Sequence, residues 1–303
     1  MSGNVEASRE TGGWHSEGRG SEETRASQPE SRRPEETEGW QLEGRGSEAY
    51  EAYLVPRFFR PWAERLLTVS GVVEGDRVLD VGCGTGIVAR SAVPLVGDEG
   101  HVVGVDLNQA MLETARMAAA RLSPSVEWRQ EDAMELSFPD DSFDRVLAQQ
   151  VLQFVEDPVG VLAELRRVLR PGGRLGLNVL RPIRYNPSYA LLAEVLERHV
   201  GEEAGVMMRS PFPEWSGTRL REFVLEAGFG EVSLYLDIRA VRYPSSEEYL
   251  RQEAASSPLA EPIAGLEENV RRRMIHHLEE ALQDYTDHDG VVFPMETHLS
   301  VAN

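Results

Sequence analysis

Apolar positions in the middle of the chain follow two alternating patterns. Short apolar runs of the kind that form strands buried on both faces are RVLDVG (77–82), HVVGVDL (101–107), SVEWRQ (125–130), SFDRVLAQQ (142–150) and RPGGRLGLNVL (170–180). Stretches with apolar residues three and four positions apart lie between them, at 86–96, 108–122 and 157–169. Strands that alternate with helices at such short intervals predict an α/β fold with a parallel sheet covered on both faces.

Helix signals flank this region. Asn108 and Asp157 precede two of the helical stretches at positions where their side chains can cap a helix, and Pro158 follows in the first turn. The segment 47–67 also has helical spacing of aromatic and aliphatic residues, but it contains Pro56 and Pro61. Because proline lacks a backbone N–H, we expect a break there, or two short helices, rather than one continuous helix.

After residue 180 the alternation gives way to longer helical stretches. The pattern predicts helices that start at Asn186–Pro187 and cover 218–228, 245–257 and 264–283, with strands at 231–241 and 291–302. We expect one domain over 49–303. Its core spans 72–181, and two helical insertions, about 182–215 and 243–288, are large enough to roof a pocket.

Residues 1–48 have a different composition. They are rich in Glu, Gly, Ser and Arg, and GWHSEGRGSE (13–22) returns as GWQLEGRGSE (39–48). Two copies are too few for a solenoid, and the segment has too little apolar surface to fold alone. It is interpreted as a disordered acidic tail with a short repeat. A tryptophan-anchored arm that binds a partner is the alternative.

Charge and cysteine content exclude several classes of chemistry. Acidic residues number 51 against 31 basic ones, for a net charge of −20, which disfavours a nucleic-acid groove. Every basic residue other than histidine is arginine, so no lysine can form a Schiff base or a Walker motif. Cys83 is the one cysteine, so no disulfide within the chain and no metal site is predicted. The chain lacks a signal-peptide pattern and any membrane-spanning apolar run, which predicts a cytoplasmic protein.

Polar side chains follow four of the predicted strands. Asp80 ends the first strand and precedes a glycine loop, and Asp106, Asp132 and Gln149 follow the next three strands. The carboxyl ends of parallel strands meet at one edge of a sheet, where ligands of such folds bind. We therefore expect the ligand site at this edge.

Two ligands fit a glycine loop in this position. Gly84, Gly86 and Ala89 satisfy the dinucleotide pattern G-x-G-x-x-G/A, with Asp106 at the distance of a ribose-binding acid. A pyrophosphate, however, would be repelled by the carboxylate of Asp80. S-adenosylmethionine carries an ammonium and a sulfonium, which suit that carboxylate. The pair Asp132–Ala133 offers an acceptor and a backbone N–H for the adenine edge, which favours S-adenosylmethionine.

Four motifs in this order resemble those of class I S-adenosylmethionine-dependent methyltransferases. They are VLDVGCGTG (78–86), VVGVDLNQAMLETAR (102–116), EDAMELSFPDDSFDRVL (131–147) and LRRVLRPGGRL (165–175). The resemblance covers about 50–180 and is closest to the small-molecule branch typified by the ubiquinone/menaquinone-biosynthesis C-methyltransferases. It implies a Rossmann-like, doubly wound sheet of seven strands in the order 3-2-1-4-5-7-6, with strand seven antiparallel, formed here by 291–302.

The resemblance also implies roles for individual residues. The glycines of the loop let it approach the methionine part of the cofactor, Asp106 takes the ribose hydroxyls and Leu107 packs on the adenine. The full set implied to bind the cofactor is Asp80, Gly82, Gly84, Thr85, Gly86, Asp106, Leu107, Asp132, Ala133 and Gln149. Candidate contacts for the methyl acceptor are Tyr53, Gln150, Arg181 and Tyr185. No catalytic residue can be assigned, because no evident base follows the fourth strand.

The expected function is methyl transfer from S-adenosylmethionine to a small, partly apolar molecule. The enzyme would mainly align the reactants and exclude water in an in-line displacement. Two alternatives remain open, a regulator of methyltransferase fold that binds the cofactor and an NAD(P)-dependent oxidoreductase. The expected partner is a small-molecule acceptor, with no nucleic acid and no membrane span.

Overall fold

A computed structural model describes residues 42, 44–123 and 125–303. The predicted tail therefore lies, for residues 1–41, outside the described part of the chain. Helix α1 (Arg45–Ala49) starts before the predicted domain boundary at residue 49. The helix is packed against the domain, because Ser47 is buried and its hydroxyl forms a hydrogen bond of 2.8 Å with that of Thr114. Within the described residues, α1 therefore packs on the rest of the chain.

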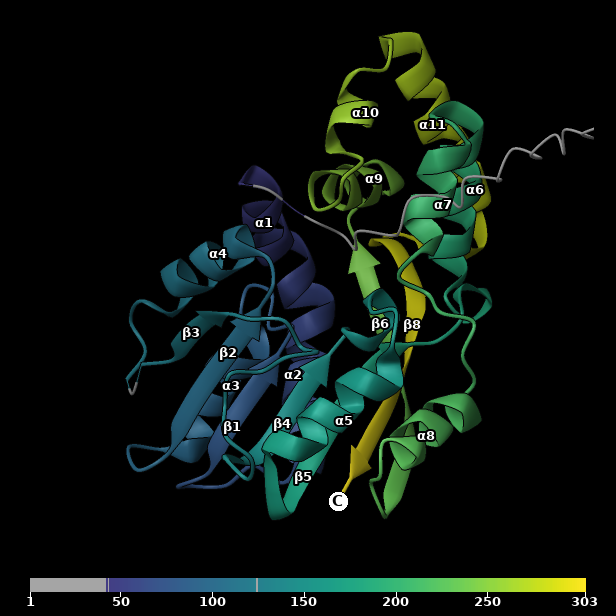
Figure 1. Cartoon of the computed structure of the whole chain (residues 1–303). Helices are drawn as coiled ribbons and strands as arrows, with labels where there is room; N and C mark the ends of the chain where they lie inside the picture. Colours follow the sequence, from purple (N-terminus) through teal and green to yellow (C-terminus); the bar gives the residue numbers. More distant parts are fainter. Residues whose placement is uncertain (1–41, 43, 124) are drawn as a thin grey trace, which may run out of the picture. The chain divides into compact units, whose positions relative to one another are not determined.

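One mixed sheet forms the centre of the described structure (Figure 1). Its strands are β1 (Arg77–Val81), β2 (His101–Asp106), β3 (Glu127–Gln130), β4 (Phe143–Gln149), β5 (Leu169–Leu180), β6 (Val232–Tyr243), β7 (Thr286–Asp287) and β8 (Gly290–Ala302). The order is β3-β2-β1-β4-β5-β8-β6, and β8 runs antiparallel to both of its neighbours. The predicted order is confirmed. The two-residue strand β7, which pairs only with β8, is an addition.

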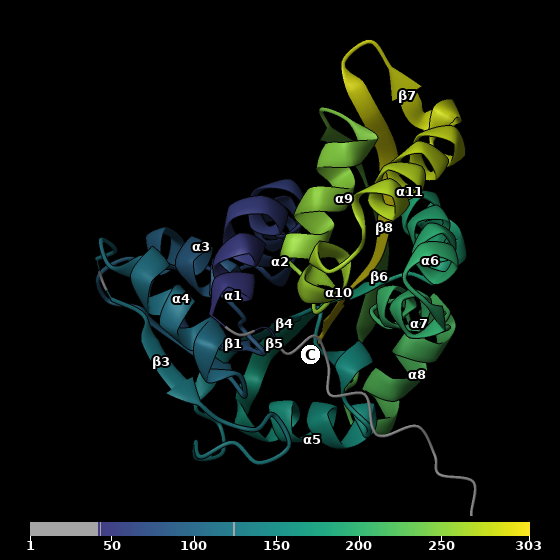
Figure 2. The same ribbon diagram turned by 90° about the horizontal axis from the view of Figure 1, so that it is seen from above.

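Helices surround this sheet (Figures 1 and 2). In chain order they are α1, a π-helix η1 (Tyr50–Phe59), α2 (Arg60–Ser70), α3 (Ile87–Val96), α4 (Gln109–Ala119), a 3-10 turn η2 (Leu152–Phe154), α5 (Pro158–Val168), η3 (Ile183–Tyr185), α6 (Pro187–His199), α7 (Glu202–Arg209), α8 (Gly217–Glu226), α9 (Ser246–Ala255), α10 (Ala260–Ala264), α11 (Glu268–Ala281) and η4 (Gln283–Tyr285). None of the helices described is both long and apolar enough to cross a bilayer.

Successive strand residues point to opposite faces and build two separate cores. On one face Val78 of β1 and Leu147 of β4 pack with apolar residues of α2 and α3. On the other face Leu79 of β1 and Val146 of β4 pack with residues of α5 and α8. Both faces of the strands are therefore apolar, which is why these segments lack alternation in the sequence.

The predicted caps of two helices are confirmed. The side chain of Asn108 accepts from the backbone N–H groups of Ala110 and Met111, and that of Asp157 accepts from Gly160 N. Pro158 occupies the first turn of α5, where its missing N–H costs nothing. These caps fix where each helix starts relative to the strand before it.

The predicted break at Pro56 is wrong. The chain runs helically from Arg45 to Ser70, with Pro56 inside the π-helical stretch η1 and Pro61 in the first turn of α2. In an α-helix the proline ring would clash with the carbonyl four residues earlier. The wider π-helical turn moves that carbonyl away, so the helix widens instead of ending.

A third core lies beyond the ends of β6 and β8, where α6, α7, α9 and α11 gather (Figure 2). It buries aromatic residues from the helices and from both strands, among them Phe58, Tyr189, Tyr243, Tyr249 and Phe293. The helices of this lobe come from the two predicted insertions. The lobe stands next to the carboxyl ends of β1, β4 and β5, above which the ligand site was expected.

Gly176 of β5 tests how closely α2 packs on the sheet. A methyl group at this position would meet Leu147 Cδ2 at 2.8 Å, and it would also meet the Ser70 hydroxyl. Gly176→Ala is expected to lower the free energy of unfolding by about 1–3 kcal/mol in urea denaturation. Gly230→Ala is the control, since its methyl would meet only the Asn303 carbonyl, at 3.8 Å. Equal stability of the two variants would contradict this packing.

Candidate functional site

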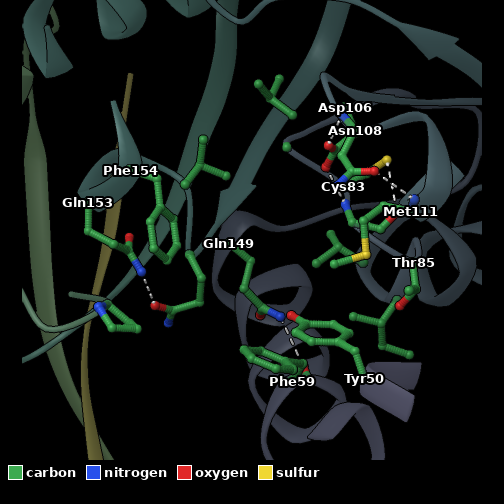
Figure 3. Close-up of a pocket in the computed structure, with 18 of the residues that line it drawn as sticks. Tyr50, Phe59, Cys83, Thr85, Asp106, Asn108, Met111, Gln149, Gln153 and Phe154 are labelled. Carbon is green, nitrogen blue, oxygen red and sulfur yellow. Dashed lines mark hydrogen bonds between the residues drawn. The ribbon is translucent and has the colours of Figure 1, made fainter. Parts of the chain in front are cut away.

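The loop after β1 is held against the end of β2 by backbone hydrogen bonds (Figure 3). Cys83 N donates to Val105 O at 2.9 Å, and Gly84 N donates to Asp106 Oδ2 at 2.7 Å. The other carboxylate oxygen of Asp106 accepts from Asn108 N at 2.8 Å. One carboxylate thus joins the glycine loop to the start of α4.

Three glycines make this loop possible. Gly82, Gly84 and Gly86 have φ values of 59°, 54° and 81°, in the left-handed region that other residues rarely adopt. No heavy atom outside the adjoining residues lies within 4 Å of where a Gly84 side chain would begin, so the loop backbone is open to a ligand. Gly86 differs, because a side chain there would collide with the indole of Trp128.

Asp80 lies at the end of β1, beneath this loop. Its side chain is buried, and Oδ2 accepts from Ala89 N, in the first turn of α3, at 2.9 Å. Burial raises the pKa of Asp80 to about 8, the charge of Asp106 adds to this, and the Ala89 hydrogen bond and Arg90 oppose it. A cation placed beside Asp80 would favour the ionised carboxylate.

A cavity of about 290 Å³ opens above these residues. Its lining includes nearly every residue predicted to bind the cofactor: Asp80, Gly82, Gly84, Thr85, Asp106, Leu107, Asp132, Ala133 and Gln149. Gly86 is not part of the lining. The Thr85 hydroxyl is buried and has no hydrogen-bond partner within the described residues, so it can donate to a ligand group. The carboxyl ends of β1, β2, β3 and β4 therefore converge on one site, as expected from the parallel sheet.

Side-chain amides occupy the middle of the cavity. Gln149 Nε2 donates to Phe59 O at 3.1 Å, and the Gln149 amide oxygen has no partner within the described residues (Figure 3). Gln150, at φ 61°, accepts from Gln153 Nε2 at 2.7 Å and from Leu180 N at 3.1 Å. These contacts hold Gln150 at the cavity wall between β4 and β5.

Of the four predicted acceptor contacts, only Gln150 lines the cavity. Arg181 forms an ion pair with Glu296 of β8 and lies over the Tyr185 ring, 3.5 Å from its centroid. The guanidinium of Arg251 packs on Tyr53, 5.0 Å from the ring centroid. Arg181, Tyr185 and Tyr53 are thus engaged with other side chains and are not brought to the cavity.

Several lining residues were not predicted. Tyr50 and Phe59 of η1 stack with ring centroids 4.9 Å apart and form one wall (Figure 3). Burial and the nearby charge of Asp106 raise the pKa of the Tyr50 hydroxyl, so this group stays protonated. Tyr50 of η1, and not the predicted Tyr53, lines the cavity. Others in the lining are Met111, Gln153, Phe154, Tyr189, Phe212, Glu253 and Met295.

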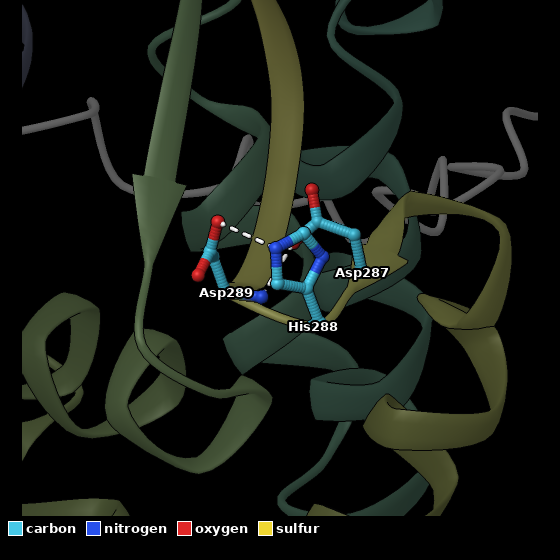
Figure 4. Close-up of side chains that lie close together, drawn as sticks. All are labelled: Asp287, His288 and Asp289. Atoms are coloured by element: carbon cyan, nitrogen blue, oxygen red, sulfur yellow. Dashed lines mark hydrogen bonds and ion pairs between the residues drawn. The ribbon is translucent and has the colours of Figure 1, made fainter.

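An exposed cluster of acidic and histidine side chains lies on the turn between β7 and β8 (Figure 4), and none of its residues lines the cavity. Ligand atoms of Asp287, His288 and Asp289 lie within 4.8 Å of one another. The Asp287 carboxylate is already paired with Arg242, at 2.6 and 2.8 Å, and this lowers its pKa. The turn is therefore a group of surface ion pairs, and we assign no metal to it.

Comparisons with known proteins agree with this geometry. Residues 79–177 match the family described as a methyltransferase domain. The chain is 40% identical over 131 residues to 2-phytyl-1,4-naphtoquinone methyltransferase of Synechococcus elongatus, covering 42% of this chain and 55% of that protein. It is 42% identical over 118 residues to the ubiquinone/menaquinone biosynthesis C-methyltransferase of Teredinibacter turnerae, covering 38% and 47%. The chain thus spans about half the length of these curated relatives.

A longer match extends the similarity. The chain is 33% identical over 184 residues to demethylmenaquinone methyltransferase of Listeria monocytogenes, covering 56% of this chain and 77% of that protein. The YcgJ protein of Bacillus subtilis (TM-score 0.54, 19% identity, 79% of this chain and 96% of that one) shares the fold. So does Haemonchus contortus phosphoethanolamine N-methyltransferase 2 in complex with S-adenosyl-L-methionine (TM-score 0.51, 22% identity, 85% and 56%). The chain belongs to the S-adenosylmethionine-dependent methyltransferase family.

The residues of the cavity fit the cofactor of this family. Asp80 places a buried carboxylate where a positively charged group can bind, and Thr85 offers a free hydroxyl. Asp106 uses each of its oxygens for one backbone N–H, and each carboxylate oxygen can accept a second hydrogen bond, for example from a hydroxyl.

A substitution at Asp106 tests whether its carboxylate binds ligand hydroxyls. Asp106→Ala removes the carboxylate that is expected to accept from the ribose, together with its hydrogen bond to the glycine loop. We expect the affinity for S-adenosylhomocysteine to fall by roughly 10- to 100-fold in isothermal titration calorimetry, as for the loss of a charged hydrogen bond. The control is Glu113→Ala, an exposed acid on α4. Unchanged affinity of Asp106→Ala would contradict the ribose role.

The raised pKa of Asp80 makes the stability of the protein depend on pH. In the folded state this pKa, about 8, lies above the usual aspartate value of 3.8, so the folded state retains a proton that the unfolded state loses as pH rises from about 4 to 8. Stability from this group is complete below pH 4 and is lost through pH 8. Asp80→Asn cannot ionise, so its melting temperature should rise relative to wild type between pH 5 and pH 8. A constant difference in circular-dichroism melts would contradict the raised pKa.

Proposed function

We propose that this protein transfers the methyl group of S-adenosylmethionine to a small, largely apolar, quinone-like acceptor in its reduced form. The observation that carries this proposal is that one continuous cavity joins two unlike ends. One end has the glycine loop and the carboxylates of Asp80 and Asp106, and the other is lined by apolar residues that include Phe58, Phe212 and Met295. A polar cofactor and an apolar acceptor can meet in such a cavity.

The cofactor, when bound, supplies an electrophilic methyl group on a sulfonium. In our proposal Asp80 neutralises its positive charge, the Gly82–Gly86 backbone and Thr85 hold its carboxylate, and Gln149 contacts the methionine part. Asp106 accepts from the ribose hydroxyls, while Leu107, Asp132 and Ala133 bind the adenine. These residues line the cavity, with the exception of Gly86, and this supports the assignment. The role of Gly86 is to shape the loop, because a side chain there would collide with Trp128.

The acceptor end accounts for the proposed substrate class. Aromatic and aliphatic side chains surround it and would exclude water, which favours displacement at a sulfonium carbon. Relatives at 33–42% identity are named for naphthoquinone, menaquinone and ubiquinone methylation. Of the acceptor contacts predicted from the sequence, Gln150 is the one that lines the cavity. Its amide can position an oxygen of the ring.

The test is transfer of labelled methyl from S-adenosylmethionine to a short-chain demethylmenaquinone analogue that has been chemically reduced under anaerobic conditions. We expect a methylated product by mass spectrometry with wild type, and much less of it with Asp106→Ala at a cofactor concentration that does not saturate the variant. Binding of S-adenosylhomocysteine without transfer to any reduced quinone would indicate a regulator instead. Binding of NADH but not of S-adenosylhomocysteine would indicate an oxidoreductase.

A further inference from the structure

A buried carboxylate stands at the acceptor end of the cavity, far in sequence from every methyltransferase motif. Glu253 belongs to α9, in the second helical insertion, and lines the cavity together with Tyr189, Phe212 and Met295. Its side chain is 1% exposed. Acidic residues are almost never buried in this way without a compensating partner, so its position needs an explanation.

The partners of Glu253 are hydroxyl groups and not a cation. Tyr243 of β6 donates to Glu253 Oε1 at 2.7 Å. Oε2 has no hydrogen-bond partner among the residues described. The guanidinium of Arg57, from η1, packs on the Tyr243 ring, 4.7 Å from its centroid, and acts on the carboxylate only through its charge. Tyr243 therefore fixes one oxygen, and the carboxylate, which the Tyr189 hydroxyl also approaches, can accept a further hydrogen bond from a ligand through Oε2.

The groups packed around Glu253 shift the pKa of its carboxyl group. The titratable and charged groups that face it are Tyr189 from α6, Tyr243 from β6, Tyr249 from α9 and Arg57 from η1. Burial raises the pKa of Glu253 to about 7, and the hydroxyls of Tyr243 and Tyr189 and the charge of Arg57 oppose the rise. Burial holds the pKa of each tyrosine above its usual range, so these groups stay neutral donors.

We propose that Glu253 is the general base of the reaction, which takes the proton of an acceptor hydroxyl through Oε2, and that the acceptor is therefore a phenol, enol or hydroquinone. The assignment rests on the proposed function for the methyl donor. It adds the catalytic base and the requirement for an ionisable hydroxyl. A general base with a pKa near the working pH is the most effective kind.

The acceptor hydroxyl gives its proton to Glu253, and the acceptor anion forms a bond from oxygen or from the conjugated ring carbon to the methyl carbon. The methyl–sulfur bond breaks and its electron pair stays on sulfur, which becomes a neutral thioether. After carbon methylation the ring proton moves to the ring oxygen, which restores the hydroxyl. In either case Glu253 passes one proton to solvent.

The matched variants are Glu253→Gln and Glu247→Gln. Both lie on α9 and remove one acidic group, but Glu247 is exposed. Glutamine at 253 keeps an oxygen that can accept from Tyr243. We expect Glu253→Gln to lower kcat/KM for the reduced demethylmenaquinone analogue by roughly 10²- to 10⁴-fold. Its affinity for S-adenosylhomocysteine should match that of Glu247→Gln, and its melting temperature should not fall below that of Glu247→Gln, because the amide replaces a buried carboxyl with a raised pKa.

Two further readouts separate a base from a packing residue. The wild-type rate should rise with pH through an inflection near 7 that Glu253→Gln lacks. The variant should also retain its activity on 2-hydroxy-1,4-naphthoquinone, whose hydroxyl is already ionised at pH 8. An equal loss on both acceptors, or a rate equal to that of Glu247→Gln, would overturn the assignment.

A spectroscopic experiment does not depend on turnover. With S-adenosylhomocysteine bound, wild type and Glu247→Gln should show the infrared band of a protonated carboxyl that titrates near pH 7 and that is missing from Glu253→Gln. No such band in wild type would overturn the role of Glu253. Failure of S-adenosylhomocysteine to bind wild type would instead refute the proposed function.

Discussion

The carboxylate of Asp106 holds together the part of the molecule on which the site depends. It accepts one hydrogen bond from a backbone N–H of the glycine loop after β1 and one from the backbone N–H of Asn108, which precedes α4. Parallel pairing of β1 and β2 brings these segments to the same edge, but pairing alone does not fix a glycine loop, whose backbone has wide conformational freedom. The charged hydrogen bonds supply that constraint. The loop thus keeps its left-handed turns before any ligand arrives.

Most of the sheet could be predicted from the sequence, because apolar runs, caps and turn glycines act locally. The strand order was predicted from the resemblance of the motifs to those of the family. The residues of the cofactor end could be predicted because the motif residues lie at the ends of adjacent strands. The helical path through Pro56 could not be predicted, since the π-helical widening depends on packing against the lobe. Tyr50, Tyr189 and Glu253 were missed for a similar reason: they lie up to about 200 positions apart and meet only through tertiary packing.

Buried carboxyl groups lie at both ends of the cavity, but their neighbours differ. Burial raises the pKa of both Asp80 and Asp106, and the charge of Asp106 raises that of Asp80 further. A cationic ligand would favour the ionised form of Asp80, so its binding would be coupled to the release of a proton. Glu253 has tyrosine hydroxyls around it instead of a second acid, which allows its proton to exchange near neutral pH. The same residue type thereby serves attraction at one end and proton transfer at the other.

The π-helix η1 lines the cavity at both the cofactor end and the acceptor end. Its first residue, Tyr50, lies at the cofactor end, while Leu54 and Phe58 line the cavity and belong to the core of the lobe. A single helix therefore lines both ends of the cavity. If a ligand at one end shifts this helix, the affinity at the other end changes, and the factor is the same in both directions. Cofactor and acceptor would bind as a thermodynamically coupled pair, with the cofactor completing the pocket into which the acceptor fits.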